Sequence, residues 1–185
     1  MMPSLLSGTL VRLTAEEPQN LAKAMSGWER DTEYARLLNN DSPIPFSQKK
    51  WTEWLEKDLD KDKPEYFSFA IRPLESEKLI GFVGFWDIQW THETCWVGIG
   101  LGERDFWGKG YGTDAMKVGL RFVFQELNLY RVSLIVFGYN ERAIRSYTKA
   151  GFREEGRLRD SIHREGQRWD DVLMGITRPE WENSH

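Results

Sequence analysis

The chain has 185 residues, which at about 150 residues per domain predicts a single domain over residues 1–185. Hydrophobic residues make up 40% and charged residues 29%, a balance that excludes disordered, collagen-like and membrane proteins. There are 25 Lys and Arg against 29 Asp and Glu, so the net charge of −4 gives no reason to expect a nucleic acid and mildly favours a cationic substrate. The single cysteine excludes an internal disulfide, and we find neither a secretory leader nor an apolar run of about 20 residues. We therefore expect a cytoplasmic protein with no membrane partner.

The N-terminal third is predicted to contain one strand followed by helices. Residues 9–13 alternate as in a strand, and residues 15–38 are broadly helical with a break near Gly27. Ser47 is a good N-cap for a further helix, and the mixed charges of residues 57–63 suit the solvated end of that helix.

Strand patterns dominate from residue 66 onward. The sequence predicts strands at 66–72, 79–90 and 95–101, and the apolar run of the last predicts burial on both faces. Beyond three glycines, two apolar stripes predict a largely buried helix that ends near residue 127. A strand at 131–137, a helix at 141–150 stopped by Gly151, and two strands joined near 164–167 complete the order. This order fits a mixed sheet covered by helices on both faces.

The segment Trp107-Gly108-Lys109-Gly110-Tyr111-Gly112-Thr113-Asp114 lies between a predicted strand and the start of a predicted helix. Glycines leave the main chain bare, and a helix start adds unpaired N–H groups with a partial positive charge. The pattern favours an anion site, most often one for phosphate. The glycine spacing fits neither a Walker loop nor a dinucleotide-binding fingerprint. The alternative is that these glycines only shape a tight turn.

The same loop resembles the Arg/Gln-x-x-Gly-x-Gly/Ala signature of the GNAT superfamily of acyl-CoA N-acyltransferases, with Gly110-Tyr111-Gly112 at its last three places. The run from Asn140 to Phe152 is similar to the second GNAT block, and the chain is most similar to the branch of ribosomal-protein-alanine N-acetyltransferases. The resemblance implies an α/β (α+β) fold with a mixed, mostly antiparallel sheet of about seven strands, helices on both faces, and a splay between strands 4 and 5. Trp107 replaces the family's Arg or Gln, but main-chain N–H groups bind the phosphates, so we still expect cofactor binding.

The resemblance also implies acetyl-CoA as cosubstrate, with no metal. Its pyrophosphate is expected on the loop and its pantetheine arm along the edge of the fourth strand, where main-chain amides offer partners. Lys109 either adds a positive charge beside a phosphate or stays solvated. Asn140 either hydrogen-bonds the pantetheine arm or caps the next helix, and it can do both. The expected cofactor-binding residues are Ile99, Gly100, Leu101, Trp107, Gly108, Lys109, Gly110, Tyr111, Gly112, Thr113 and Asn140.

Tyr147 matches the position of the family's general acid. A phenol with a pKa of about 10 can protonate a departing thiolate whose conjugate acid has a pKa of about 8.5. The alternative is a core tyrosine with its hydroxyl at the surface. Trp96 stands where many relatives carry a Glu that acts as the general base. We therefore expect that the substrate amine loses its proton through a water chain to Asp87, Glu93 or Glu103, or that the amine itself has a low pKa.

The resulting hypothesis is an N-acetyltransferase that transfers the acetyl group of acetyl-CoA to a primary amine by direct attack in a ternary complex. The amine belongs to a protein N-terminus or a small molecule. The alternative is a non-catalytic acyl-CoA sensor. Cys95 has no His or acid at a telling spacing, which disfavours a covalent enzyme intermediate. Phe85, Trp86, Trp90 and Trp96 suggest either an aromatic acceptor pocket or core packing, and the many aromatics are compatible with a homodimer.

Overall fold

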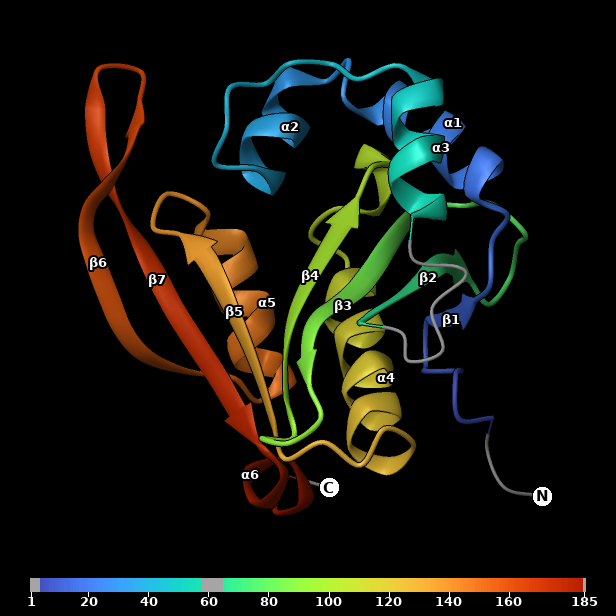
Figure 1. The fold of residues 1–185 in the computed structure, drawn as a ribbon, viewed down its shortest axis with the longest axis vertical. Helices are drawn as coiled ribbons and strands as arrows, with labels where there is room; N and C mark the ends of the chain where they lie inside the picture. Colours follow the sequence, from blue (N-terminus) through green and yellow to red (C-terminus); the bar gives the residue numbers. More distant parts are fainter. Residues whose placement is uncertain (1–3, 58–64, 185) are drawn as a thin grey trace.

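A computed structural model describes residues 4–57 and 65–184. Within these residues, seven strands form one sheet in the order β1-β2-β3-β4-β5-β7-β6, and all neighbours are antiparallel except β4 and β5 (Figure 1). The expected fold class is confirmed. The strands are Val11–Thr14 (β1), Tyr66–Pro73 (β2), Gly81–Gln89 (β3), Thr94–Leu101 (β4), Arg131–Phe137 (β5), Arg153–Arg164 (β6) and Gln167–Thr177 (β7).

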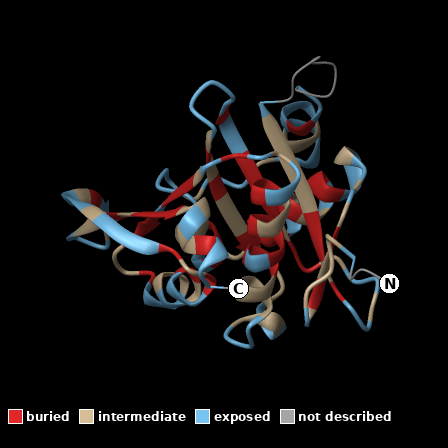
Figure 2. Ribbon diagram, turned by 90° about the horizontal axis from the view of Figure 1, so that it is seen from below, coloured by how far each residue is buried: buried red, intermediate tan, exposed pale blue. Residues whose placement is uncertain are grey.

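Helices cover both faces of the sheet. α4 and α5 lie behind it in Figure 1, whereas α1, α2 and α3 lie at the top of the view, near the start of β3 and the end of β4. The core between α4 and the sheet is closely packed, because a Cβ on Gly119 of α4 would lie 2.8 Å from the ring of Phe85. Figure 2 shows buried residues concentrated where α4 meets the strands. The helices are Pro18–Trp28 (α1), Thr32–Leu38 (α2), Gln48–Glu56 (α3), Tyr111–Gln125 (α4), Glu141–Ala150 (α5) and Arg178–Glu182 (α6), with a 3-10 turn at Arg104–Phe106.

The sheet splits between its two parallel strands. β4 and β5 pair only from Thr94 to Trp96 and from Arg131 to Ser133, and beyond these residues the strands separate. The far end of β4 therefore has one unpaired edge. This is the predicted splay.

Several element predictions need correction. The break in the first helical stretch comes at residues 29–31 rather than at Gly27, because Asp31 accepts hydrogen bonds from Glu33 N and Tyr34 N and starts a new helix. The strand predicted at 95–101 is not buried on both faces: Cys95, Val97 and Gly100 are buried, whereas Trp96, Gly98, Ile99 and Leu101 are half-buried. α6 was not predicted, although Thr177 and Glu180 form a capping box at its start. Residues 58–63 of the predicted solvated helix end lie outside the described residues.

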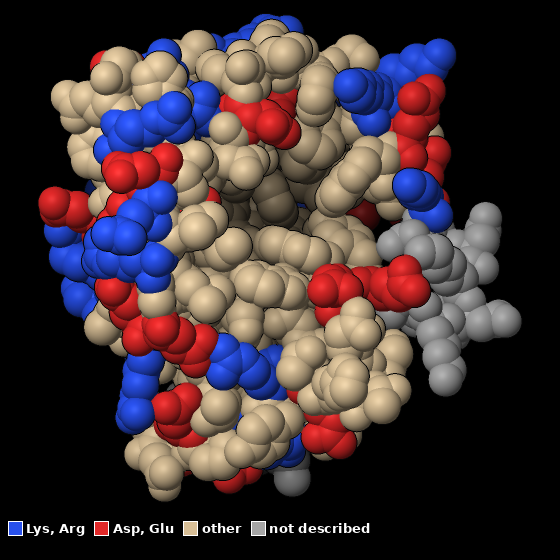
Figure 3. Space-filling model, turned by 60° about the vertical axis from the view of Figure 1, so that its left-hand side comes forward, with Lys and Arg blue, Asp and Glu red and all other residues tan. Residues whose placement is uncertain are grey.

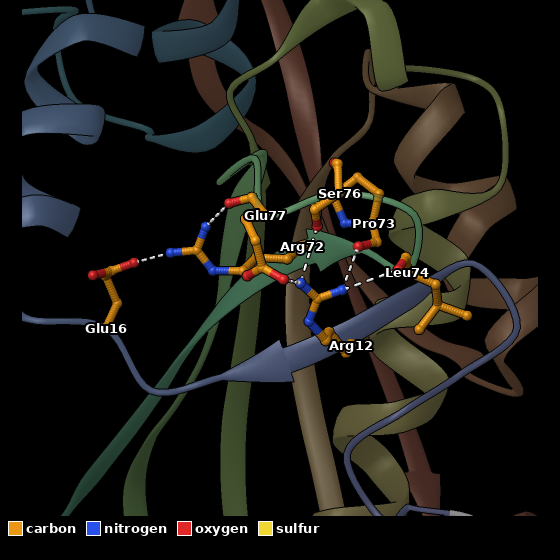
Figure 4. A network of polar contacts seen from close by, with 7 residues as sticks. All are labelled: Arg12, Glu16, Arg72, Pro73, Leu74, Ser76 and Glu77. Atoms are coloured by element: carbon orange, nitrogen blue, oxygen red, sulfur yellow. Dashed lines mark hydrogen bonds and ion pairs between the residues drawn. The ribbon is translucent and has the colours of Figure 1, made fainter.

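A polar network fastens the first two strands at the edge of the sheet (Figure 4). Arg12 donates to the carbonyl of Pro73 at 2.7 Å and pairs with Glu77, while Arg72 pairs with Glu16. None of these residues lines the main cleft, so the network is structural. In the described part of the chain, no helix is both long and apolar enough to cross a membrane, and no three potential metal ligands come together.

Candidate active site

A cleft of about 580 Å³ passes through the split in the sheet. On one side it is lined by α2, through Tyr34, Leu37 and Leu38. On the other side it reaches α4 and α5, where the hydroxyl oxygens of Thr113 and Ser146 lie 2.7 Å apart. The cleft therefore connects the two faces of the sheet at the point where β4 and β5 separate.

The glycine loop forms one end of this cleft. Gly108 and Gly110 have φ angles of +73° and +91°, which glycine adopts at little cost, and Gly110 is the N-cap of α4 without a capping side chain. The first N–H groups of α4 have no acceptor within the helix. Gly112 packs close to Leu101, because an added Cβ would lie 3.4 Å from the leucine side chain. The loop thus presents bare main-chain donors at a helix start, which suits a phosphate.

Trp107 explains how the loop keeps its shape without the family's Arg or Gln. Its Nε1 donates to the carbonyl of Leu101 at 2.6 Å, and the guanidinium of Arg142 lies 4.0 Å from its ring centre. The indole ties the loop to β4 on one side and to α5 on the other.

The free edge of β4 exposes alternate main-chain groups. Gly102 N donates to the carbonyl of Ile80 at 3.0 Å, and antiparallel pairing alternates, so the main-chain groups of Gly100 face β3 while those of Ile99 and Leu101 face the split. The indole N–H of Trp107 already donates a hydrogen bond to the carbonyl of Leu101. The main-chain N–H and C=O of Ile99 and the N–H of Leu101 remain available to pair with the amides of an extended ligand.

α5 brings Asn140 and Tyr147 to the opposite wall. Asn140 Oδ1 accepts from Ala143 N at 3.2 Å, so the helix-capping role is observed, and its Nδ2 donates to the carbonyl of Leu37 at 3.5 Å. Tyr147 lines the cleft and is 9% exposed; burial raises the pKa of its hydroxyl to about 12. Cys95 is buried in the core, and burial also raises the pKa of its thiol to about 12, so it stays protonated and unreactive.

The charge of the cleft differs from that of the whole chain. Four cationic residues line it, Lys117, Arg142, Arg145 and Lys149, against one carboxylate, Asp114. That carboxylate accepts hydrogen bonds from the main chain of residues 9–11 and from Thr9 Oγ1, at 2.8 to 3.1 Å. The cleft is therefore suited to a polyanionic ligand, although the chain as a whole is acidic.

Most of the residues predicted from the sequence meet in this cleft. It is lined by Ile99, Leu101, Trp107, Gly108, Gly110, Gly112, Thr113, Asn140 and Tyr147, but not by Gly100, Lys109 or Tyr111. Gly100 instead makes room for α2, since an added Cβ would lie 2.8 Å from the Tyr34 hydroxyl. The Tyr111 hydroxyl points to Glu75 at 3.3 Å.

None of the three carboxylates considered as a base lines the cleft. Glu103 pairs with Lys78 at 2.5 Å and accepts from Trp28 Nε1 at 3.0 Å. Burial alone would raise the pKa of Glu103, but these two hydrogen bonds outweigh it and lower that pKa. Asp87 accepts from the side chain of Gln89, and both Asp87 and Glu93 are exposed.

Sequence reasoning missed Tyr34 and the role of Asp114. The Asp114 contact spans 105 residues, and only the loop position of Asp114 hinted at it. Tyr34 lies on a short helix far from both motifs, so no local pattern pointed to it.

A sheet split beside a glycine loop at a helix start, with a tyrosine on the facing helix, is the arrangement expected of an acyl-CoA-dependent acyltransferase. The family model described as an acetyltransferase (GNAT) domain matches residues 9–153, and the chain belongs to this family. It is an acetyl-CoA-dependent N-acetyltransferase of the GNAT type. Membership of an enzyme family favours catalysis over the sensor alternative.

Relatives with curated names agree with this assignment. The chain is 32% identical over 151 residues to the SPbeta prophage-derived uncharacterized N-acetyltransferase YokL of Bacillus subtilis (strain 168), covering 80% of this chain and 82% of the relative. It is 25% identical over 116 residues to the [Ribosomal protein uS5]-alanine N-acetyltransferase of Escherichia coli (strain K12), covering 62% of this chain and 59% of that protein.

Among solved structures, the chain is similar to spermidine N-acetyltransferase from Vibrio cholerae in complex with CoA and spermine. The TM-score is 0.82 and the identity 22%, over 94% of this chain and 98% of that one. This likeness shows a shared fold.

Proposed function

We propose that this chain, as one domain, transfers the acetyl group of acetyl-CoA to a primary amine by direct attack in a ternary complex. The observation that carries the proposal is the cleft itself, which joins the glycine loop, the free edge of β4 and Tyr147 across the split. Acetyl-CoA supplies the activated acetyl group and leaves as the CoA thiolate.

The proposed cofactor site rests on bare main chain and on positive charge. The N–H groups of Gly108 to Thr113 hold the pyrophosphate, supported by the start of α4. Lys117, Lys149 and Arg145 line the same cleft and offer charge to further phosphate oxygens. Asp114 does not repel them strongly, because its carboxylate is engaged by four donors.

The pantetheine arm lies along the free edge of β4 in this proposal. Ile99 offers both main-chain groups and Leu101 its N–H, while Asn140 lines the wall where α5 begins. A main-chain N–H of β4 also stabilises the negative charge that develops on the thioester oxygen as the amine attacks.

Tyr147 is the proposed general acid. When the carbon–sulfur bond breaks, its hydroxyl gives its proton to the departing thiolate sulfur. Burial raises the pKa of Tyr147 to about 12, so the phenol keeps its proton from neutral pH up to well above the ordinary pKa of a tyrosine. The same low-dielectric surroundings make the thiolate more basic, which offsets the raised pKa of the donor.

Water in the cleft is the proposed route for the proton that leaves the amine. Asp87, Glu93 and Glu103 all lie outside the lining, and Trp96 replaces the usual glutamate. The acceptor is a protein N-terminus or a small-molecule amine.

Tyr147→Phe tests the chemistry. We expect kcat to fall by about 100-fold or more, while the Kd of acetyl-CoA from calorimetry changes little. Tyr130→Phe is the matched control, because Tyr130 is exposed at the start of β5, and its kcat should not change. Equal kcat for the wild type and Tyr147→Phe would remove the assignment, and failure of acetyl-CoA to bind would remove the cofactor site.

A further inference from the structure

The face of the sheet toward α2 is uncharged where β4 and β5 separate. Paired strand residues point to the same side, and Gly100 faces α2, so its partners on β3, β4 and β5 can be assigned to this face. Figure 3, viewed from the side of β6 and β7, shows a hollow with broad uncharged surface below it and acidic residues at its rim. The residues on this face of β3, β4 and β5 beside the split are uncharged, and Arg131, one pair farther from the split, is paired with Glu155. The uncharged residues are Phe82, Gly84, Trp86, Trp96, Gly98, Gly100, Ser133 and Ile135.

Two large apolar side chains on this face are left open to solvent. Trp86 is 41% exposed and Ile135 is 53% exposed, and they lie on the two strands that flank β4, Trp86 on β3 and Ile135 on β5. The Trp86 indole is fixed against the strand, because a Cβ on Gly98 would lie 2.8 Å from its ring. Phe85, the neighbour of Trp86, points the other way into the core. Exposed apolar surface that borders a catalytic edge marks a ligand-binding wall.

α2 adds apolar groups next to this face, because Tyr34 approaches Gly100. Tyr34, Leu37 and Leu38 line the cleft, and Tyr34 is only 3% exposed. The helix is held in place, since the Tyr139 hydroxyl donates to the carbonyl of Arg36 at 2.7 Å. The apolar residues of α2 therefore continue the uncharged surface of the sheet.

Three acidic residues near this space already have cationic neighbours. Asp31 and Glu33 both pair with Arg104, and Glu155 pairs with Arg131. A second ammonium group on the substrate that lost its hydration here would find these three carboxylates already paired.

Asp171, farther along β7 beside Phe137, has one carboxylate oxygen engaged by Ser161 at 2.8 Å. Its other oxygen is buried and has no hydrogen-bond partner among the described residues. That oxygen is closed off from solvent, so a substrate ammonium group does not reach it.

We propose that the acceptor is a primary amine carried on an aromatic or aliphatic group, which packs against Trp86, Ile135 and α2 while the amine reaches the edge of β4. This inference rests on the proposed function and narrows its substrate class. A polyamine, as named for the similar Vibrio cholerae enzyme, is a poor fit to these walls.

Rates of CoA release with matched amines test the inference. We expect kcat/KM for phenethylamine and tryptamine to exceed that for putrescine and spermidine by tenfold or more. A second pair consists of tripeptide amides that begin with Phe or Lys, and kcat/KM should be higher for the Phe peptide. Comparison of kcat/KM between the Phe peptide and phenethylamine distinguishes a peptide source from a small amine. Polyamines or Lys peptides that react as well or better would overturn the inference while leaving the function intact. If acetyl-CoA binds but no amine in the panel releases CoA, the proposed function itself fails.

Two variants place the effect on this face. Trp86→Ala should raise KM for phenethylamine at least fivefold with an unchanged Kd for acetyl-CoA, whereas Leu74→Ala, which is 44% exposed in the turn before β3, should change neither. Ile135→Glu adds a carboxylate at an exposed position and should lower the preference for phenethylamine over putrescine at least fivefold. Unchanged parameters in both variants would show that the acceptor lies elsewhere.

Discussion

The hydroxyl of Tyr34 is a buried polar group whose removal should stabilise the protein. Its oxygen has no hydrogen-bond partner among the described residues, and Tyr34 is 3% exposed. A buried, unsatisfied hydroxyl costs about 1–3 kcal/mol, and Tyr34→Phe removes the oxygen without leaving a large cavity. We therefore expect the free energy of unfolding to rise by about 1–2 kcal/mol. For a chain of this size, each kcal/mol shifts Tm by about 2–4 °C.

Urea unfolding with an unchanged m value measures this gain, and Tyr139→Phe provides a matched control. The Tyr139 hydroxyl donates to the carbonyl of Arg36 on the same helix, so its loss should destabilise the protein by about 1 kcal/mol. The two Tyr→Phe changes thus carry opposite signs. Destabilisation by Tyr34→Phe would refute the reasoning, because it would mean that the hydroxyl has a partner in solution.

Three further changes have expected outcomes in unfolding experiments. Asp114→Asn places an amide NH₂ or a weaker acceptor against the N–H groups of residues 9–11, and urea titration should show a loss of about 2–3 kcal/mol. Gly151→Ala forces a φ of +108° on alanine and brings its Cβ to 2.9 Å from a core isoleucine, so Tm should fall with a loss of about 1–3 kcal/mol. Burial raises the pKa of Tyr147 from 10.0 to about 12, so its contribution to stability is complete below pH 10 and is lost as the pH rises toward 12. The free energy of unfolding of Tyr147→Phe should therefore fall less steeply than that of the wild type between pH 10 and 12. Identical pH dependence of the two proteins in this range would contradict a buried phenol.

Elements with strong local signals could be predicted almost to the residue. β5 and α5 have the expected bounds, because Asn140 caps the helix and Gly151, at φ +108°, ends it. α6 has an equally local signal in its capping box, which sequence reasoning overlooked. β4 was misjudged for a different reason: an apolar run does not reveal that one of its faces borders a cleft.

Some residues of the candidate site could likewise be predicted from local motifs, and others could not. The glycine loop, Asn140 and Tyr147 could be found because each belongs to a compact motif. Tyr34 could not, since its approach to Gly100 depends on the path of α2 over the sheet.

By itself, the sequence determined the pieces whose geometry is set by neighbouring residues: the left-handed glycines of the loop, the helix caps and the strands with their alternation. Those features arise from backbone sterics and from hydrogen bonds that span a few residues. The tertiary structure alone decided where β4 and β5 part, which cations face the cleft, and how far burial shifts the pKa of Tyr147. Each of these depends on contacts between residues far apart in the chain, and such contacts exist only once the whole sheet has formed.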